Sequence, residues 1–247
     1  MLNILRLVRA RIKRSYSVSH SYKKVSVFSD VDIAKTIETW QLESTPREQW
    51  KIVSQQIQRL KQSIETTEFR SFREALETSY EINDCFNVLE VGCSSGYYSE
   101  VLNRSFPNSS YTGVDFSKKF IEFGVEKFPN INLQQMDAQD LGEFDDRQFD
   151  CVVSGCVLLH IPNWEIALIE SARVANRILI LHRTPLSDTN TKRYIKSAYG
   201  SPTLEWQFSI NDINELLAAK SFQLKNVIPL SVSDNGQVAT MIYERIL

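Results

Sequence analysis

One short segment, Asn87–Tyr97 (NVLEVGCSSGY), combines residue types that suit ligand binding. Its first residues predict an apolar strand that ends around the acid Glu90, followed by a turn with Gly92 and Gly96 and then a helix. Open α/β sheets bind ligands beyond the carboxyl ends of their strands, which is where this turn would lie. The glycines let the backbone approach a ligand closely, and the acid can meet a cationic group or a hydroxyl.

The same turn is a poor match to a dinucleotide site. Such a site has the pattern G-x-G-x-x-G, with a helix N-terminus facing the pyrophosphate. Here Ser94 takes the place of the middle glycine, and no glycine follows Gly96 at the next two or three positions. A nicotinamide-dependent reductase would also need a Y-x-x-x-K pair in the expected context, which the chain lacks. The turn therefore favours another ligand.

Acids also close the next two predicted strands. Asp115 ends the second, 25 residues after Glu90, and Met136-Asp137 ends the third. A carboxylate after the second strand can accept hydrogen bonds from both hydroxyls of a ribose. Met136 can lie against an adenine ring, and Asp137 can accept from its exocyclic amine. One acid at a strand end is more often a helix cap or a solvated turn, but three in succession favour a nucleoside-containing ligand.

Together these motifs resemble those of the class I S-adenosylmethionine (SAM)-dependent methyltransferases. The resemblance covers about residues 87–247 and rests on LEVGCSSGYYS, GVDFS, QMDA and FDCVVSGCVLLHIPNWEIAL. It implies SAM as cofactor, its methionine part near the glycine turn, its ribose on Asp115 and its adenine between Phe116 and Met136. The cofactor-binding residues that it implies are Glu90, Gly92, Ser94, Gly96, Asp115, Phe116, Met136, Asp137, Ala138 and Ser154.

Strand and helix patterns alternate from residue 87 onward. The helices begin near Tyr97, Ser117 and Asn163, and Ser117 is expected to cap its helix. The predicted strands are 87–91, 110–114, 131–136, 149–154 and 177–182. This alternation predicts a parallel sheet covered on both faces.

Two later strands, 224–230 and 238–245, flank Asp234-Asn235-Gly236, a strong hairpin signal. With the family resemblance, we expect an α/β, Rossmann-like class I methyltransferase fold. It would have a mostly parallel seven-stranded sheet, a C-terminal antiparallel hairpin and an N-terminal helical extension.

The segment before the sheet reads as helical from residue 32 to residue 80. Thr45 and Glu48 fit a capping box, and apolar residues then recur every three or four positions from Trp50 to Ile64. This stripe either packs on the following domain or forms a cap over a substrate cleft or a dimer surface. We divide the chain into a basic segment (1–30), a helical extension or cap (31–82) and a methyltransferase domain (83–247).

Signals for the acceptor are weaker. The segment from Ser154 to His160 lacks the polar residue, two prolines and aromatic of many amine-modifying nucleic-acid methyltransferases. We therefore expect a small-molecule, saccharide or lipid-linked acceptor, methylated at oxygen. His160 and His182 follow predicted strands, where an imidazole with a pKa near 6.5 can act as the base. The alternative for each is a structural histidine, and Arg183 either pairs with an acidic substrate group or forms a salt bridge.

A second, shorter similarity concerns residues 182–208. This stretch resembles a bacterial group of putative methyltransferases linked to surface polysaccharide synthesis. A non-catalytic protein with a SAM-type fold, acting as a scaffold or partner subunit, stays open beside the enzyme. The oligomeric state is also open.

Composition and charge limit the classes of substrate and partner that we expect. The chain has 247 residues, 43% hydrophobic and 23% charged, as in ordinary globular proteins. Seven of its 28 basic residues and none of its 30 acids lie in residues 1–24, so the remaining body is acidic and disfavours a nucleic-acid substrate. The first residues fit a flexible terminus, a helix on anionic lipid or an organelle-import presequence. We thus expect a cytoplasmic protein, with membrane contact through residues 1–24 or organelle import as alternatives.

Metal and disulfide chemistry are not expected. The four cysteines form no C-x-x-C pair, and the chain has only three histidines, so a zinc site would have few ligands. Free thiols in a reducing compartment are the simplest interpretation.

Overall fold

Five parallel strands form the centre of the structure, a computed structural model that describes residues 19–198, 200–233 and 236–246. In spatial order β4-β3-β2-β5-β6, they are joined at β6 by the antiparallel strands β10 and β9. Their bounds are β2 (Asn87–Val91), β3 (Ser110–Asp115), β4 (Asn132–Gln135), β5 (Phe149–Gly155), β6 (Ala175–Ser187), β9 (Phe222–Ser233) and β10 (Gly236–Arg245). This seven-stranded arrangement confirms the predicted fold, closing hairpin included.

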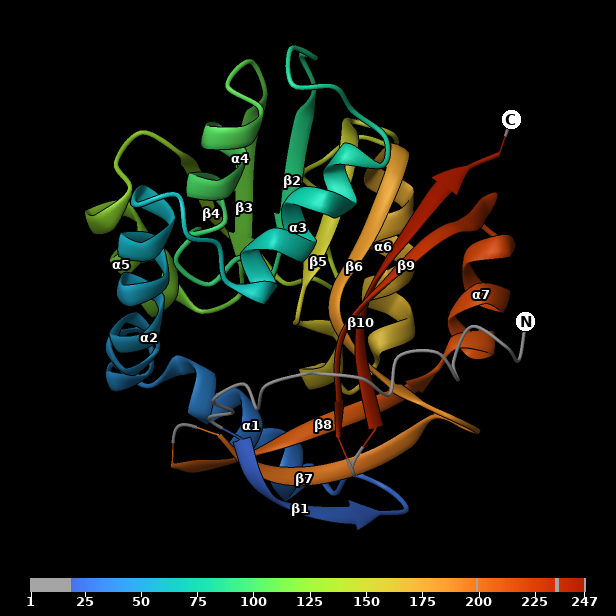
Figure 1. Ribbon diagram of the computed structural model, residues 1–247. Helices are drawn as coiled ribbons and strands as arrows, with labels where there is room; N and C mark the ends of the chain where they lie inside the picture. The colour runs from blue at the N-terminus through green and yellow to red at the C-terminus, as the bar shows by residue number, and fades with distance from the viewer. Residues whose placement is uncertain (1–18, 199, 234–235, 247) are drawn as a thin grey trace.

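Helices cover both faces of this sheet, because alternate strand residues are apolar on each side. In Figure 1, α3 (Thr67–Glu77) and α4 (Ser99–Ser105) lie in front of the sheet and α6 (Trp164–Val174) lies behind it. Val88 of β2 belongs to the core under the front helices, and its neighbour Leu89 belongs to the core on the other face. The remaining helices of the domain are α5 (Lys118–Lys127) and α7 (Ile210–Ala218).

A second group of strands was not predicted. β1 (Ser19–Val25), β7 (Lys192–Ala198) and β8 (Ser201–Ser209) pair antiparallel in the order β1-β7-β8. β8 joins the central sheet where Leu186 of β6 pairs with Phe208, and Figure 1 shows these strands at one end of the molecule. Residues 19–25 of the predicted basic segment thus belong to this sheet. We call β1, β7, β8 and α1 the cap.

Helix α1 (Asp30–Gln41) lies against β8 of the cap. The backbone N–H of Leu204 donates to the Thr36 hydroxyl at 3.0 Å, and the Thr39 hydroxyl donates to the Pro202 carbonyl at 3.2 Å. Helix α2 (Ser44–Lys61) follows after a short turn. In the chain, α1 and α2 thus lead from the strands of the cap to the central domain.

The start of α2 differs from the sequence expectation. The predicted capping box of Thr45 and Glu48 is wrong, because the helix already begins at Ser44 and no side chain caps it. The Thr45 hydroxyl donates instead to the Thr39 carbonyl at 2.8 Å, and Glu48 pairs with Lys51. The predicted apolar stripe is buried at its centre, at Val53, Ile57 and Leu60.

Among the described residues, no helix has the length and apolar composition needed to cross a bilayer. The predictions for the first 18 residues, lipid contact and organelle import, lie outside the part of the chain that the structure describes.

Candidate active site

The turn after β2 has a backbone that few residues can adopt. Gly92, Ser94 and Gly96 have φ angles of 70°, 53° and 75°, in the left-handed region that favours glycine. A Cβ at Gly92 would lie 2.3 Å from the Cβ of Val157, so only a residue without a side chain fits at this position. Val157 follows β5, and the ends of β2 and β5 therefore meet closely.

Asp115, at the end of β3, holds this turn. Its two carboxylate oxygens accept the backbone N–H groups of Ser94 and Ser117, each at 2.9 Å. Burial raises its pKa to about 6, although the two hydrogen bonds act in the opposite direction. Because a carboxylate has about four lone-pair sites, Asp115 can still accept hydrogen bonds from a ligand hydroxyl.

Glu90 is the most deeply buried acid of the site, with 1% of its surface exposed. The Tyr111 hydroxyl donates to it at 2.5 Å, and a Cβ at Gly155 would lie 2.7 Å from its Oε1. Burial raises the pKa of Glu90 to about 8, and the charge of Asp115 adds to the shift. Within the described chain, neither carboxyl forms an ion pair.

The other predicted cofactor residues lie at the same edge of the sheet. The N–H of Met136 donates to the Asp115 carbonyl at 3.0 Å, and Ser154 pairs with Val91 across β5 and β2. Met136, Ala138 and Ser154 are buried, Phe116 is half-buried and Asp137 is exposed. The structure thus gathers all ten predicted residues around the carboxyl ends of β2, β3, β4 and β5.

Helices α1 and α2 reach over this edge. The Ser117 hydroxyl donates to the Trp40 carbonyl at 2.7 Å, so it does not cap α5 as predicted. Gln49 of α2 donates from Nε2 to the Ser94 hydroxyl at 3.2 Å. Trp40 and Gln49 could not be predicted from the sequence, because both contacts join segments far apart in the chain.

His160 lies between the central domain and the cap. Its Nδ1 is 2.8 Å from the Leu204 carbonyl of β8, and its ring centroid is 4.8 Å from that of Trp40. A carbonyl only accepts hydrogen bonds, so Nδ1 carries the proton and Nε2 keeps a lone pair. Burial lowers the pKa of His160 to about 3, with a contribution from the charge of Lys196, and the imidazole is neutral near pH 7.

His182 has a different environment. Its side chain is fully buried, with Nδ1 2.8 Å from the Thr240 hydroxyl and Nε2 2.8 Å from the Tyr98 hydroxyl. Thr240 in turn contacts the Ser71 hydroxyl at 3.3 Å. Both ring nitrogens are therefore engaged in a network that ties β6 to β10, to α3 and to the residue that precedes α4, and neither is left for an acceptor.

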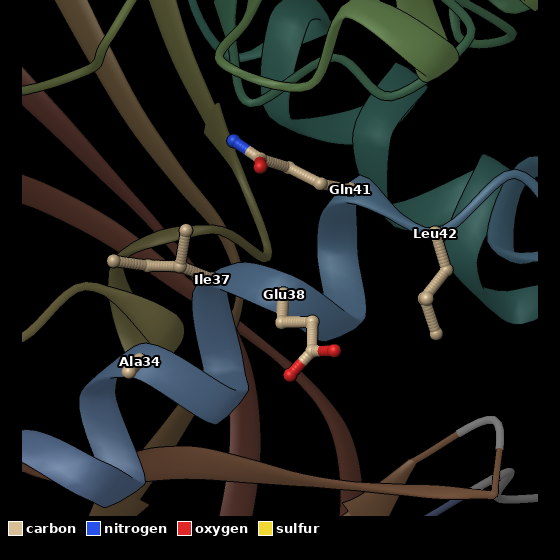
Figure 2. Close-up of a pocket in the computed structure, with 5 residues that line it drawn as sticks. All are labelled: Ala34, Ile37, Glu38, Gln41 and Leu42. Atoms are coloured by element: carbon tan, nitrogen blue, oxygen red, sulfur yellow. The ribbon is translucent and has the colours of Figure 1, made fainter.

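A shallow hollow of about 390 Å³ lies on α1, lined by Ala34, Ile37, Glu38, Gln41 and Leu42. Figure 2 shows the Gln41 amide extending away from the helix on the side opposite the Glu38 carboxylate. Ile37 is 44% exposed, so part of the lining is apolar. Because Gln41 follows Trp40, the hollow borders the helix end that contacts His160.

The side chains offer no metal centre in the described part of the chain, where no group of three or more His, Cys, Asp or Glu residues could hold an ion. The four cysteines are free thiols.

The strand order and the closing hairpin are those of the class I methyltransferase fold, with the glycine turn and the acids at its carboxyl edge. Residues 89–177 match the family model described as a methyltransferase domain. The match covers somewhat more than a third of the chain, and the fold is that of the class I SAM-dependent methyltransferases.

Curated relatives are similar in sequence to part of the chain. Demethylmenaquinone methyltransferase of Staphylococcus carnosus is 32% identical over 126 residues, which cover 49% of this chain and 52% of that protein. The chain thus spans about half the length of the curated relatives that it matches.

Solved structures share the fold. Magnesium protoporphyrin IX methyltransferase from Synechocystis, with bound SAM, has a TM-score of 0.60 at 18% identity and covers 90% of this chain and 100% of that one. The 1,6-didemethyltoxoflavin-N1-methyltransferase of Burkholderia thailandensis, with bound substrate and S-adenosylhomocysteine, has a TM-score of 0.64 at 14% identity and covers 93% and 99%.

Proposed function

We propose that this chain binds SAM and transfers its methyl group to a hydroxyl oxygen of a small-molecule acceptor. The observation that carries the proposal is the pair of buried acids, Glu90 and Asp115, which flank the glycine turn without a cationic partner among the described residues. Buried carboxyls with raised pKa values in such a place are typical of ligand sites. SAM carries two positive charges, on its sulfonium and its ammonium, and suits this surface.

In this proposal, each predicted cofactor residue contacts a different part of SAM. Glu90 faces the ammonium group of the methionine part, and Asp115 accepts from the ribose. Met136 and Phe116 lie along the adenine, whose amine is bound by the exposed carboxylate of Asp137. The glycine turn can approach this ligand because Gly92 and Gly96 let its backbone pack tightly against Val157 and Ile131, where a Cβ would not fit.

SAM supplies an activated methyl group, so the protein's contribution is mainly alignment of the acceptor. We assign the acceptor to the space between the end of β5 and α1, next to His160 and the hollow on α1. A neutral His160 can accept a hydrogen bond from a hydroxyl through Nε2 and so orient its oxygen. A pKa near 3 makes it a weak proton acceptor, which favours acidic hydroxyls such as those of phenols and quinols. His182 is not retained as a base.

The proteins with related sequences and folds act on small ring compounds according to their names: demethylmenaquinone, magnesium protoporphyrin IX and didemethyltoxoflavin. They support a small-molecule acceptor over a nucleic acid. Saccharide and lipid-linked acceptors stay among the compounds to be tested.

The proposal is tested by methyl transfer. Purified protein is incubated with SAM labelled in its methyl group and a panel of quinols, phenols and saccharides, each paired with its O-methylated form. We expect label in a hydroxyl compound and none in the methylated partner. Binding of SAM with no transfer to any member, together with a stoichiometric protein partner, would instead favour a scaffold.

A further inference from the structure

Strand β6 contains a β-bulge at its carboxyl end. Its pairing with β10 shifts between Leu181 and Thr184, so that His182 and Arg183 together face one residue of β10, Thr240. Arg183 has a φ of 57°, in the left-handed region that a non-glycine residue adopts at a cost. Bulges of this kind redirect a side chain and are common beside active sites.

Arg183 directly follows His182 in this bulge, and the His182 ring packs edge-on against Tyr98. The positive charge of the Arg183 guanidinium is near enough to the Tyr98 hydroxyl to counteract the rise that burial causes in its pKa. Tyr97, Cys156 and Glu68 are its other polar neighbours, close enough to act on its charge. The side chain is half-buried, and no carboxylate of the described residues lies within 4 Å of it.

This position adjoins the glycine turn. Tyr97 and Tyr98 directly follow Gly96, and the N–H of Cys156 donates to the His182 carbonyl at 3.0 Å. Gly155, which pairs with His182, is the residue that packs against Glu90. Arg183 therefore stands at the border between the proposed cofactor residues and the end of β5.

We propose that Arg183, positioned by Tyr98 and the bulge, binds a carboxylate group of the ligands of this site. A half-buried guanidinium that has no carboxylate within salt-bridge distance among the described residues is costly, and its planar fork matches a carboxylate in two parallel hydrogen bonds. Two sources fit this chemistry: the α-carboxylate of SAM and a carboxylate on the acceptor. The inference rests on the proposed function.

Calorimetric titration separates the two sources. S-adenosylhomocysteine carries the α-carboxylate, and 5′-methylthioadenosine lacks the whole amino-acid part. If Arg183 binds the cofactor, Arg183→Gln weakens binding of S-adenosylhomocysteine at least about 10-fold, leaves 5′-methylthioadenosine unchanged, and Arg183→Lys is intermediate. The control is Arg177→Gln, at the opposite end of the same strand, where Arg177 pairs with Glu244 at 3.3 Å.

A second titration tests whether Arg183 binds a carboxylate of the acceptor. Protein saturated with S-adenosylhomocysteine is titrated with 4-hydroxybenzoate and with its methyl ester. Loss of the preference for the acid in Arg183→Gln, with cofactor affinity unchanged, assigns the arginine to the acceptor.

Three results overturn the proposal or what it rests on. Equal loss of both nucleosides in Arg183→Gln indicates a purely structural arginine. An unchanged affinity for S-adenosylhomocysteine, with no acid preference in the unsubstituted protein, also overturns it. Failure of the unsubstituted, folded protein to bind either nucleoside instead contradicts the proposed function itself. Thermal unfolding of each variant shows whether it is folded.

Discussion

The backbone N–H of Ser94 donates to the carboxylate of Asp115 at 2.9 Å, so the residue that ends β3 fixes the turn that follows β2. This bond explains how a serine keeps a φ of 53° where related turns have glycine. It also means that Asp115 has two tasks, because the group proposed to bind the ribose first shapes the turn beside it.

The packing of Gly92 leads to a first prediction. Gly92→Ala places a methyl group on a backbone with a φ of 70° and 2.3 Å from the Val157 Cβ, so we expect a loss of about 1–3 kcal/mol in unfolding free energy and of SAM binding. Chemical denaturation and calorimetry measure both. Adding Val157→Gly, which removes the Cβ that the new methyl group would meet, should restore part of the loss, whereas Gly142→Ala, near only the Asp140 carboxylate, should change little. A fully stable, SAM-binding Gly92→Ala protein would contradict this packing.

Glu90 gives a prediction for pH. Its pKa is about 8 in the folded protein and near the ordinary 4.5 when unfolded, so between these values the folded state binds an extra proton. This carboxyl therefore makes the protein less stable as pH rises from about 4.5 to 8, and the full penalty persists above pH 8. Glu90→Gln should remove the penalty and gain on the order of 5 kcal/mol at pH 9, with little gain near pH 4.5.

The measurement is the difference in unfolding free energy between Glu90→Gln and the unsubstituted protein across pH 4.5–9. The same variant should bind SAM more weakly, because it lacks the charge proposed to face the ammonium group. A difference that does not vary with pH would show that Glu90 keeps an ordinary pKa.

His160 allows a test without a known acceptor. Burial and the charge of Lys196 hold its pKa near 3, so the ring should be neutral throughout pH 5–8. The Cε1–H resonance of His160, assigned by comparison with His160→Gln, should show no inflection in this range. A midpoint near 6.5 would mean that the ring is solvated, and His160 would then regain the role of a titrating base.

The contact between Ser117 and Trp40 predicts how firmly α1 is held. Ser117→Ala removes the 2.7 Å hydrogen bond to the Trp40 carbonyl, so amides of α1 should exchange with solvent about 2- to 10-fold faster. Hydrogen-exchange mass spectrometry of residues 30–41 measures this. Ser105→Ala at the end of α4 is the matched control, and equal exchange in both variants would rule out this anchoring.

The central sheet and the acids of the site were predictable because their signals are local. Glu90, Asp115 and Asp137 each close a short strand, and parallel strands bring their carboxyl ends to one edge. Because strands and helices alternate along the chain, only a few arrangements of the strands in a parallel sheet are possible.

The cap was not predictable in this way. β1 pairs with β7, about 170 residues later in the chain, and a pairing at that distance has no local signature. β6 was predicted only over residues 177–182, because its bulge at Arg183 interrupts the alternation of faces before the strand ends at Ser187. The two histidines could not be told apart from the sequence, because their partners come from distant elements. Tyr98 and Thr240 occupy both ring nitrogens of His182, whereas His160 uses only Nδ1, toward the Leu204 carbonyl.

The most direct test of the account is calorimetric titration with SAM and S-adenosylhomocysteine, comparing the unsubstituted protein with Asp115→Asn. This substitution keeps the size of the side chain but removes its charge and one acceptor. Glu143→Gln, an exposed acid away from the site, is the control. We predict micromolar binding of both compounds by the unsubstituted protein. In Asp115→Asn alone, the affinity should fall at least 10-fold, which corresponds to about 1.4 kcal/mol or more of binding free energy. Absence of binding by the folded, unsubstituted protein would contradict it.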